Sequence, residues 1–218
     1  SKNIVTKNNE QNVENTILFI SVSTINVGKI ILLNQLLKSK YKCIIGIDIK
    51  YYKNSDQFNK DILKYSDHIV NFLKNDINKF INCPKTFLDI NILKKKYGVK
   101  IENFNGRWKN NPSKLGSLEW FNNSEYEYFW YVEDDIYGKN YDLFIDSYNY
   151  NTNDLICTIN ENHLPPWYYN RWRVGNICHG FDHASLYVAR YSKQFSKYFF
   201  NFLIETTSTS HHEILIHY

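Results

Sequence analysis

The sequence predicts an α/β fold with a mainly parallel sheet flanked by helices. The runs 17–23 and 43–48 are almost continuously apolar, and residues 27–37 between them carry apolar side chains at helical spacing. A strand, a helix and a second strand in this order are typical of a βαβ unit, whose strands run parallel. A third run, 128–132, is apolar or aromatic at successive positions, which favours a central strand covered on both faces.

Periodicity and capping residues predict the remaining elements. Ser55 and Ser192 precede helical patterns as N-caps, and Gly98 follows one in the position where helices commonly end. The polar residues 1–16 predict a disordered tail. Further helices are expected over 56–65, 87–97, 113–121, 141–148 and 195–203, and further strands over 67–72, 154–159 and 185–189.

Composition limits the classes of protein that fit. With 218 residues, 43% of them hydrophobic, we expect a single domain over 17–218, with an α/β half to residue 135 and an irregular half from 136. The net charge of +4 comes from scattered lysines and does not require a nucleic-acid partner. Gly28 is the only glycine in the first strand–helix turn, so the dinucleotide-binding fingerprint and the P-loop are both absent. The cysteines form no C-x-x-C pair that would indicate zinc.

Three consecutive acids, Glu133, Asp134 and Asp135, end the aromatic strand. Ligands of open α/β sheets bind at the carboxyl ends of the strands, so a rigid element would hold these carboxylates at a binding edge. Three neighbouring carboxylates repel one another and favour a bound cation, and hard oxygen ligands suit Mg²⁺ or Mn²⁺ that also holds phosphate. The alternative interpretation is a solvated acidic turn.

The stretch 131–136, followed by 141–144, resembles the Glu-Asp-Asp version of the metal-binding motif in GT-A nucleotide-sugar glycosyltransferases. It looks like the version found in inverting N-acetylglucosaminyltransferases. The wider order of elements over 17–218 is similar to glycosyltransferase-like proteins of fungi and giant viruses. The resemblance implies a GT-A-like (Rossmann-like) sheet, with a nucleotide-sugar-binding half over 17–135 and an acceptor half over 136–218. It also implies metal-dependent transfer of a sugar from a nucleotide-diphosphate sugar, with UDP as the first choice of nucleotide, to a hydroxyl of a glycan or glycoconjugate. Inversion at the anomeric carbon is expected, and retention, which would need no general base, is the alternative.

The resemblance also assigns roles at the donor side. Asp135 would ligate Mn²⁺ or Mg²⁺, and Glu133 and His211 would be further metal ligands. Alternatively, Glu133 would contact the ribose or the donor sugar, which is also the role expected for Asp134. Polar groups at strand ends and in the loop 102–112 would bind the nucleotide sugar, and a lysine at the start of the helix before the acids would neutralise its diphosphate. These donor-side candidates are Ser21, Ser23, Asp48, Trp108 and Lys114. For the strand-end serines and Asp48, ordinary loop polarity is the alternative.

The acceptor side is expected in the proline- and aromatic-rich segment 164–173 and near the end of the chain. Tryptophan faces stack on pyranose rings, so Trp167, Arg171 and Trp172 are candidate acceptor-binding residues, unless the loop only packs over the core. Glu213 is the expected general base, with Asp182 as the alternative. Glu213 also completes a capping-box pattern, which alone would explain it.

Two other functions remain open from the sequence. One is a metal-dependent nucleotidyltransferase or phosphoester hydrolase that uses the same acids, and the other is a non-catalytic carbohydrate-binding module built on the aromatic loop. No apolar run has membrane-spanning length and no signal peptide is visible, so we expect a cytoplasmic protein, in the host cytoplasm if the chain is viral. Because the chain begins at Ser1 without Met, the Golgi lumen is the alternative if an anchor was removed.

Overall fold

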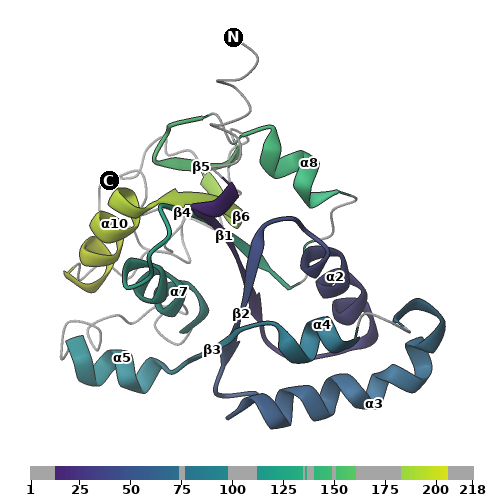
Figure 1. The fold of residues 1–218 in the computed structure, drawn as a ribbon. Helices are drawn as coiled ribbons and strands as arrows, with labels where there is room; N and C mark the ends of the chain where they lie inside the picture. Colours follow the sequence, from purple (N-terminus) through teal and green to yellow (C-terminus); the bar gives the residue numbers. More distant parts are fainter. Residues whose placement is uncertain are drawn as a thin grey trace.

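A six-stranded mixed sheet with helices on both faces forms the centre of the fold (Figure 1). The computed structural model describes residues 13–73, 77–97, 112–134, 136, 140–148, 151–160 and 183–205. The α/β class and the helix-flanked sheet predicted from the sequence are confirmed.

The strand order places the first strand in the middle of the sheet. The strands are β1 (Thr16–Val22), β2 (Lys42–Asp48), β3 (Lys85–Leu88), β4 (Tyr128–Glu133), β5 (Leu155–Asn160) and β6 (His183–Ser192). Their order is β3-β2-β1-β4-β6-β5. The first four strands are mutually parallel, and β6 lies antiparallel between β4 and β5. The predicted parallel arrangement therefore holds for β1 to β4, whereas both pairings of β6 are antiparallel.

The helices divide between the two faces of the sheet (Figure 1). Their bounds are α2 (Val27–Leu37), α3 (Ser55–Leu73), α4 (Ile77–Asn82), α5 (Ile90–Tyr97), α7 (Pro112–Asn122), α8 (Tyr141–Asp146) and α10 (Lys193–Glu205). One apolar core joins α5, α7 and α10 to the sheet, and the other joins α2, α3, α4 and α8. Because β1 and β4 are buried on both faces, their nearly continuous apolar sequences are explained.

The Phe19 ring of β1 occupies the space over Gly46 of β2. A Cβ at residue 46 would stand 2.3 Å from two carbon atoms of the Phe19 ring. Phe19 also stacks on Tyr131 of β4, with ring centroids 6.2 Å apart. The glycine in β2 therefore leaves room for an aromatic layer that extends towards the acidic end of β4.

The strand predicted over 67–72 is wrong, because these residues belong to the 19-residue helix α3. Phe58 and Ile62 are buried at helical spacing, and neither glycine nor proline interrupts the chain from residue 55 to 73. A helix that is already nucleated adds one hydrogen bond for each further residue, so it continues through a short β-branched run.

The helix predicted over 87–97 is wrong in its first turn. Residues 85–88 form the edge strand β3, which pairs in parallel with β2. Asp89 ends the strand and caps the helix, since its Oδ1 accepts a hydrogen bond from the Asn91 amide at 2.7 Å. The sequence reading also missed α4 and placed Thr16 in the tail, although β1 begins there; residues 1–12 of that tail lie outside the described part.

The described part of the second half contains β5, β6, α8 and α10, and its two strands complete the same sheet. Ser192 is confirmed as a cap of α10, because its Oγ accepts a hydrogen bond from the Phe195 amide at 3.1 Å. The predicted cap Ser55 is wrong, because α3 begins at Ser55 and the Asn54 Oδ1 accepts the capping hydrogen bond from the Gln57 amide at 3.0 Å. The irregular segment expected over 164–173 lies outside the described residues. Within the described part of the chain, no helix combines the length and apolar composition that a membrane span requires.

Candidate functional site

The carboxyl ends of β1 and β4 meet at a point where the strand order reverses. From β1 the chain continues to β2 and β3 on one side, and β4 then enters the sheet on the other side of β1. In open α/β sheets, ligands bind in the crevice outside such a reversal. Ser21 and Glu133 are directly paired in register here, so the fold brings predicted residues from distant parts of the sequence to one edge.

Asp134 ties the end of β4 to the turn between β1 and α2. Its Oδ2 accepts hydrogen bonds from the Ser23 amide at 2.8 Å, from the Ser23 hydroxyl at 3.0 Å and from the Lys29 Nζ at 2.6 Å. The Lys29 Nζ also donates to the Ser23 Oγ at 2.7 Å. Charge-assisted hydrogen bonds of this kind are about twice as strong as neutral ones. This oxygen of Asp134 therefore has a structural role, because it links the end of β4 to the turn after β1. The predicted contact of Asp134 with the ribose or the donor sugar stays a prediction.

Glu133 pairs with Lys114, which lies in the first turn of α7. The Lys114 Nζ is 2.7 Å from the Glu133 Oε1, and the two side chains are 8% and 23% exposed. The same ammonium group lies 4.1 Å from the centroid of the Tyr131 ring, within cation–π range. Lys114 was predicted to bind the diphosphate of the donor. In the structure its ammonium group lies at the carboxyl end of β4, beside Glu133, and diphosphate binding stays a prediction.

Tyr131 and Ser21 form a neutral layer below the charged groups. Burial, with a smaller contribution from the Glu133 carboxylate, raises the pKa of the Tyr131 phenol well above its ordinary value. A hydrogen bond with the Ser21 side chain opposes this increase of the pKa. Ser21 therefore has a structural partner in the described part of the chain, and its predicted contact with the nucleotide stays a prediction.

The fold supplies positive charge to two of the three consecutive acids. Consecutive carboxylates were expected to need a metal cation, but Glu133 and Asp134 are each paired with a lysine ammonium group. Because Lys29 is 105 residues from Asp134 in the sequence, only the fold brings them together. Repulsion between these two acids is therefore relieved without a metal ion.

A divalent metal fits the donor chemistry of this edge only in part. Carboxylate oxygens suit Mg²⁺ and Mn²⁺. In the described part of the chain, however, no group of three or more His, Cys, Asp or Glu side chains is arranged to hold a metal ion. Of the predicted ligands, Glu133 is described and paired with Lys114, whereas Asp135 and His211 lie outside the described residues. A metal site here would therefore depend on Asp135.

Asp48 lies at the same edge, at the end of β2. Its Oδ1 accepts a hydrogen bond from the Lys50 amide at 2.8 Å. Burial raises the pKa of the Asp48 carboxyl, the Lys50 amide and charge lower it, and the nearby Asp89 carboxylate raises it slightly further. Asp48 is therefore a half-buried acceptor beside the candidate site, consistent with its predicted position but without a shown ligand role.

Eight predicted site residues are not among those that the structure describes. Those that lie outside the described residues are Trp108, Asp135, Trp167, Arg171, Trp172, Asp182, His211 and Glu213. In turn, the sequence reading missed Lys29. The sequence feature that could have indicated Lys29 is its position in the first turn of α2, directly after the end of β1. The Asn26 side chain caps this turn and accepts a hydrogen bond from the Lys29 amide at 2.9 Å.

Comparison with protein-family models and with curated proteins finds no match to this chain.

Proposed function

We propose that this chain is a metal-dependent glycosyltransferase of the GT-A type. It would move a sugar from a nucleotide diphosphate, in the first place UDP, to a hydroxyl of a glycan or glycoconjugate, with inversion. The observation that carries the proposal is the gathering of Ser21, Ser23, Glu133 and Asp134 at the strand-order reversal, where α/β sheets bind ligands. The resemblance of the acidic strand to the GT-A motif supports the same function.

The two lysines have the charge that a leaving diphosphate needs. The Lys29 and Lys114 ammonium groups lie on the two sides of the acidic strand end, and each is held by one acid. Preorganised positive charge stabilises negative charge that develops on a leaving group. When the donor binds, either lysine can exchange its carboxylate for a phosphate oxygen.

A divalent cation, when bound through Asp135 and Glu133, would act as a Lewis acid on the same diphosphate. Glu213, with Asp182 as the alternative, would take the proton from the acceptor hydroxyl as the new glycosidic bond forms at the anomeric carbon. Trp167, Arg171 and Trp172 would orient the acceptor.

One alternative keeps the phosphate chemistry. Paired lysines and acids at a strand-order reversal would also serve a metal-dependent nucleotidyltransferase or phosphoester hydrolase. A carbohydrate-binding module would depend on the aromatic segment alone.

Titration with UDP in the presence and absence of Mn²⁺ tests the proposal. We expect saturable UDP binding that strengthens with Mn²⁺ and that loses its Mn²⁺ dependence in Asp135→Asn, while melting is unchanged. Asp56→Asn, an exposed acid at the start of α3, is the matched control and should bind like the parent. Unchanged Mn²⁺ dependence in folded Asp135→Asn would contradict the metal assignment. Hydrolysis of a nucleoside triphosphate without use of a UDP-sugar would favour the phosphoester alternative.

A further inference from the structure

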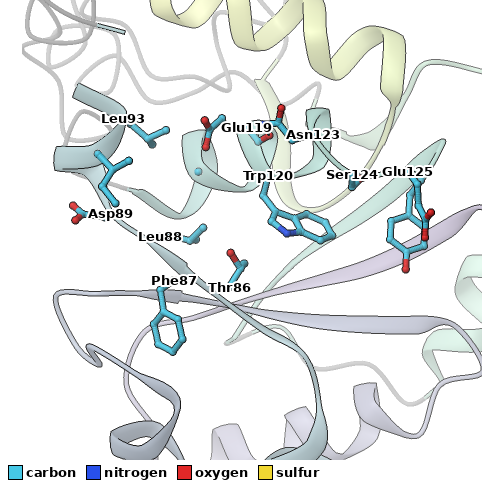
Figure 2. Close-up of a pocket in the computed structure, with 13 residues that line it drawn as sticks. Thr86, Phe87, Leu88, Asp89, Leu93, Glu119, Trp120, Asn123, Ser124 and Glu125 are labelled. Atoms are coloured by element: carbon cyan, nitrogen blue, oxygen red, sulfur yellow. Dashed lines mark hydrogen bonds between the residues drawn. The ribbon is translucent and has the colours of Figure 1, made fainter. Parts of the chain in front are cut away.

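A cavity of about 600 Å³ opens between α5 and α7, over the edge strand β3 (Figure 2). Thr86 and Leu88 of β3 contribute to its floor, and Leu93 of α5 and Trp120 of α7 to its walls. This volume is in the range of sites that hold small organic molecules. Glu133 and Asp134 do not line it, so the cavity is separate from the candidate site at the ends of β1 and β4.

One wall of the cavity is aromatic. The Trp120 and Tyr126 rings lie 6.5 Å apart at an interplanar angle of 28°, and Trp120 packs at 5.4 Å from Phe19 in the core. Gly116, one turn before Trp120, lets α7 approach the sheet, because a Cβ there would be 3.0 Å from Leu88. The indole is thus held from behind by the core and presents a surface to the cavity.

Three carboxylates from three parts of the fold line the same space: Asp89 before α5, Glu119 on α7 and Glu125 before β4. Among the described residues that line the cavity there is no lysine or arginine. In the view of Figure 2, Trp120 lies between Asp89 at one end and Glu125 at the other. Two lysines lie beside this lining: Lys96 pairs with Glu119 at 2.6 Å, and the Lys42 Nζ lies 5.6 Å from the centroid of the Tyr126 ring. The three acids still outnumber these two bases, in a chain whose net charge is +4.

Glu119 has a neighbour that a ligand could replace. The Lys96 Nζ is 2.6 Å from the Glu119 Oε1, but the Lys96 side chain is 52% exposed. Exposed ion pairs contribute about 0–1 kcal/mol to stability, so Lys96 can give up this contact to a ligand at small cost. The Glu119 side chain is 21% exposed, and its Oε1 also accepts a hydrogen bond from the Tyr97 hydroxyl at 3.3 Å. An ammonium group of a ligand could therefore take the place of Lys96 on the exposed side of this carboxylate.

We propose that this cavity binds a linear aliphatic polyamine. Its ammonium groups would pair with Asp89, Glu119 and Glu125, and its methylene chain would lie across the Trp120 ring. Cations are attracted to the face of an indole, and the carboxylates complement the charge along the length of the molecule. A neutral saccharide could stack on Trp120 and donate hydroxyl hydrogen bonds to these acids, but it would leave their charges unbalanced, and an anion would be repelled. This inference is independent of the proposed glycosyl transfer.

Isothermal titration of the full chain with spermidine at low salt tests the proposal. We expect saturable binding of one molecule per chain that weakens as salt is added, because salt screens exposed charges. Asp89→Asn and Glu119→Gln should each weaken binding about two- to fivefold, the range of single exposed ion pairs, and together about tenfold. Asparagine can still cap α5, so the first change should preserve the fold. Asp56→Asn is the control, since α3 packs on the other face of the sheet.

Several outcomes would overturn the proposal. These are no saturable heat with spermidine, unchanged affinity in the double variant, or equal binding of methyl glucoside or of Mg²⁺ at the same concentrations. If circular dichroism shows that the double variant has lost its fold, Glu125→Gln serves instead, because this exposed side chain can change without disturbing the core. A parent-like affinity in Glu125→Gln would then count against the site.

Discussion

Replacing Asp134 with asparagine tests whether this acid is a structural brace. The change keeps the shape of the side chain but removes the charge that Lys29 faces. Both side chains are largely buried, with 12% and 17% exposure, and the Asp134 Oδ2 accepts three hydrogen bonds. Asparagine can still accept from Ser23 through its own oxygen, so the main loss is the ionic contact to Lys29.

The expected cost lies between two limits. Breaking a fully buried pair by removing one partner costs about 3–5 kcal/mol, and an exposed pair contributes about 0–1 kcal/mol. At the observed exposure we expect Asp134→Asn to lower the free energy of unfolding by about 2 kcal/mol. For a chain of this length, that corresponds to a fall in melting temperature of about 4–8 °C.

Thermal and urea unfolding measure this change, and the exposed pair of Lys40 and Asp146 provides the control. Those side chains are 48% and 40% exposed, so Lys40→Met should alter stability by no more than about 0.5 kcal/mol. A double variant of Asp134→Asn with Lys29→Met should give a coupling energy of at least about 1 kcal/mol. A loss below about 0.5 kcal/mol in Asp134→Asn, within the range of ordinary surface changes, would refute the brace.

Three further predictions concern packing, thiol reactivity and catalysis. Gly46→Ala should lower the free energy of unfolding in urea by about 1–3 kcal/mol, because the new methyl group would stand 2.3 Å from the Phe19 ring. The control Gly28→Ala in α2 has no such clash, so it should be neutral or stabilise the fold by up to about 1 kcal/mol. A larger loss of stability in Gly28→Ala than in Gly46→Ala would contradict this packing. Burial raises the pKa of the Cys43 thiol to about 12, so alkylation of this residue at pH 8, followed by mass spectrometry, should be negligible in the native protein and rapid only in denaturant. Glu213→Gln should reduce sugar transfer by about 10²–10⁴-fold with unchanged melting, and a parent-like rate would leave Glu213 as a helix cap only.

The sequence by itself determined the elements whose signals are local. Apolar runs at 17–23, 43–48 and 128–132 predicted the three central strands, because a strand buried on both faces must be apolar at successive positions. Ser192 was recognised as a cap since its partner, the Phe195 amide, is three residues away. The position of the acids at the end of β4 also followed, because they adjoin the strand in sequence.

The surroundings of those acids depend on contacts between distant segments of the chain. Glu133 pairs with Lys114 of α7, and Asp134 pairs with Lys29 of α2. Because Lys29 and Asp134 are 105 residues apart in the sequence, no local pattern predicts their contact. The placement of β6 between β4 and β5, and the cavity between α5 and α7, likewise arise from pairings of distant segments. Periodicity reports which side of an element is buried, but not which partner covers it. Charge balance at a site depends on that partner, so it becomes visible only in the folded chain.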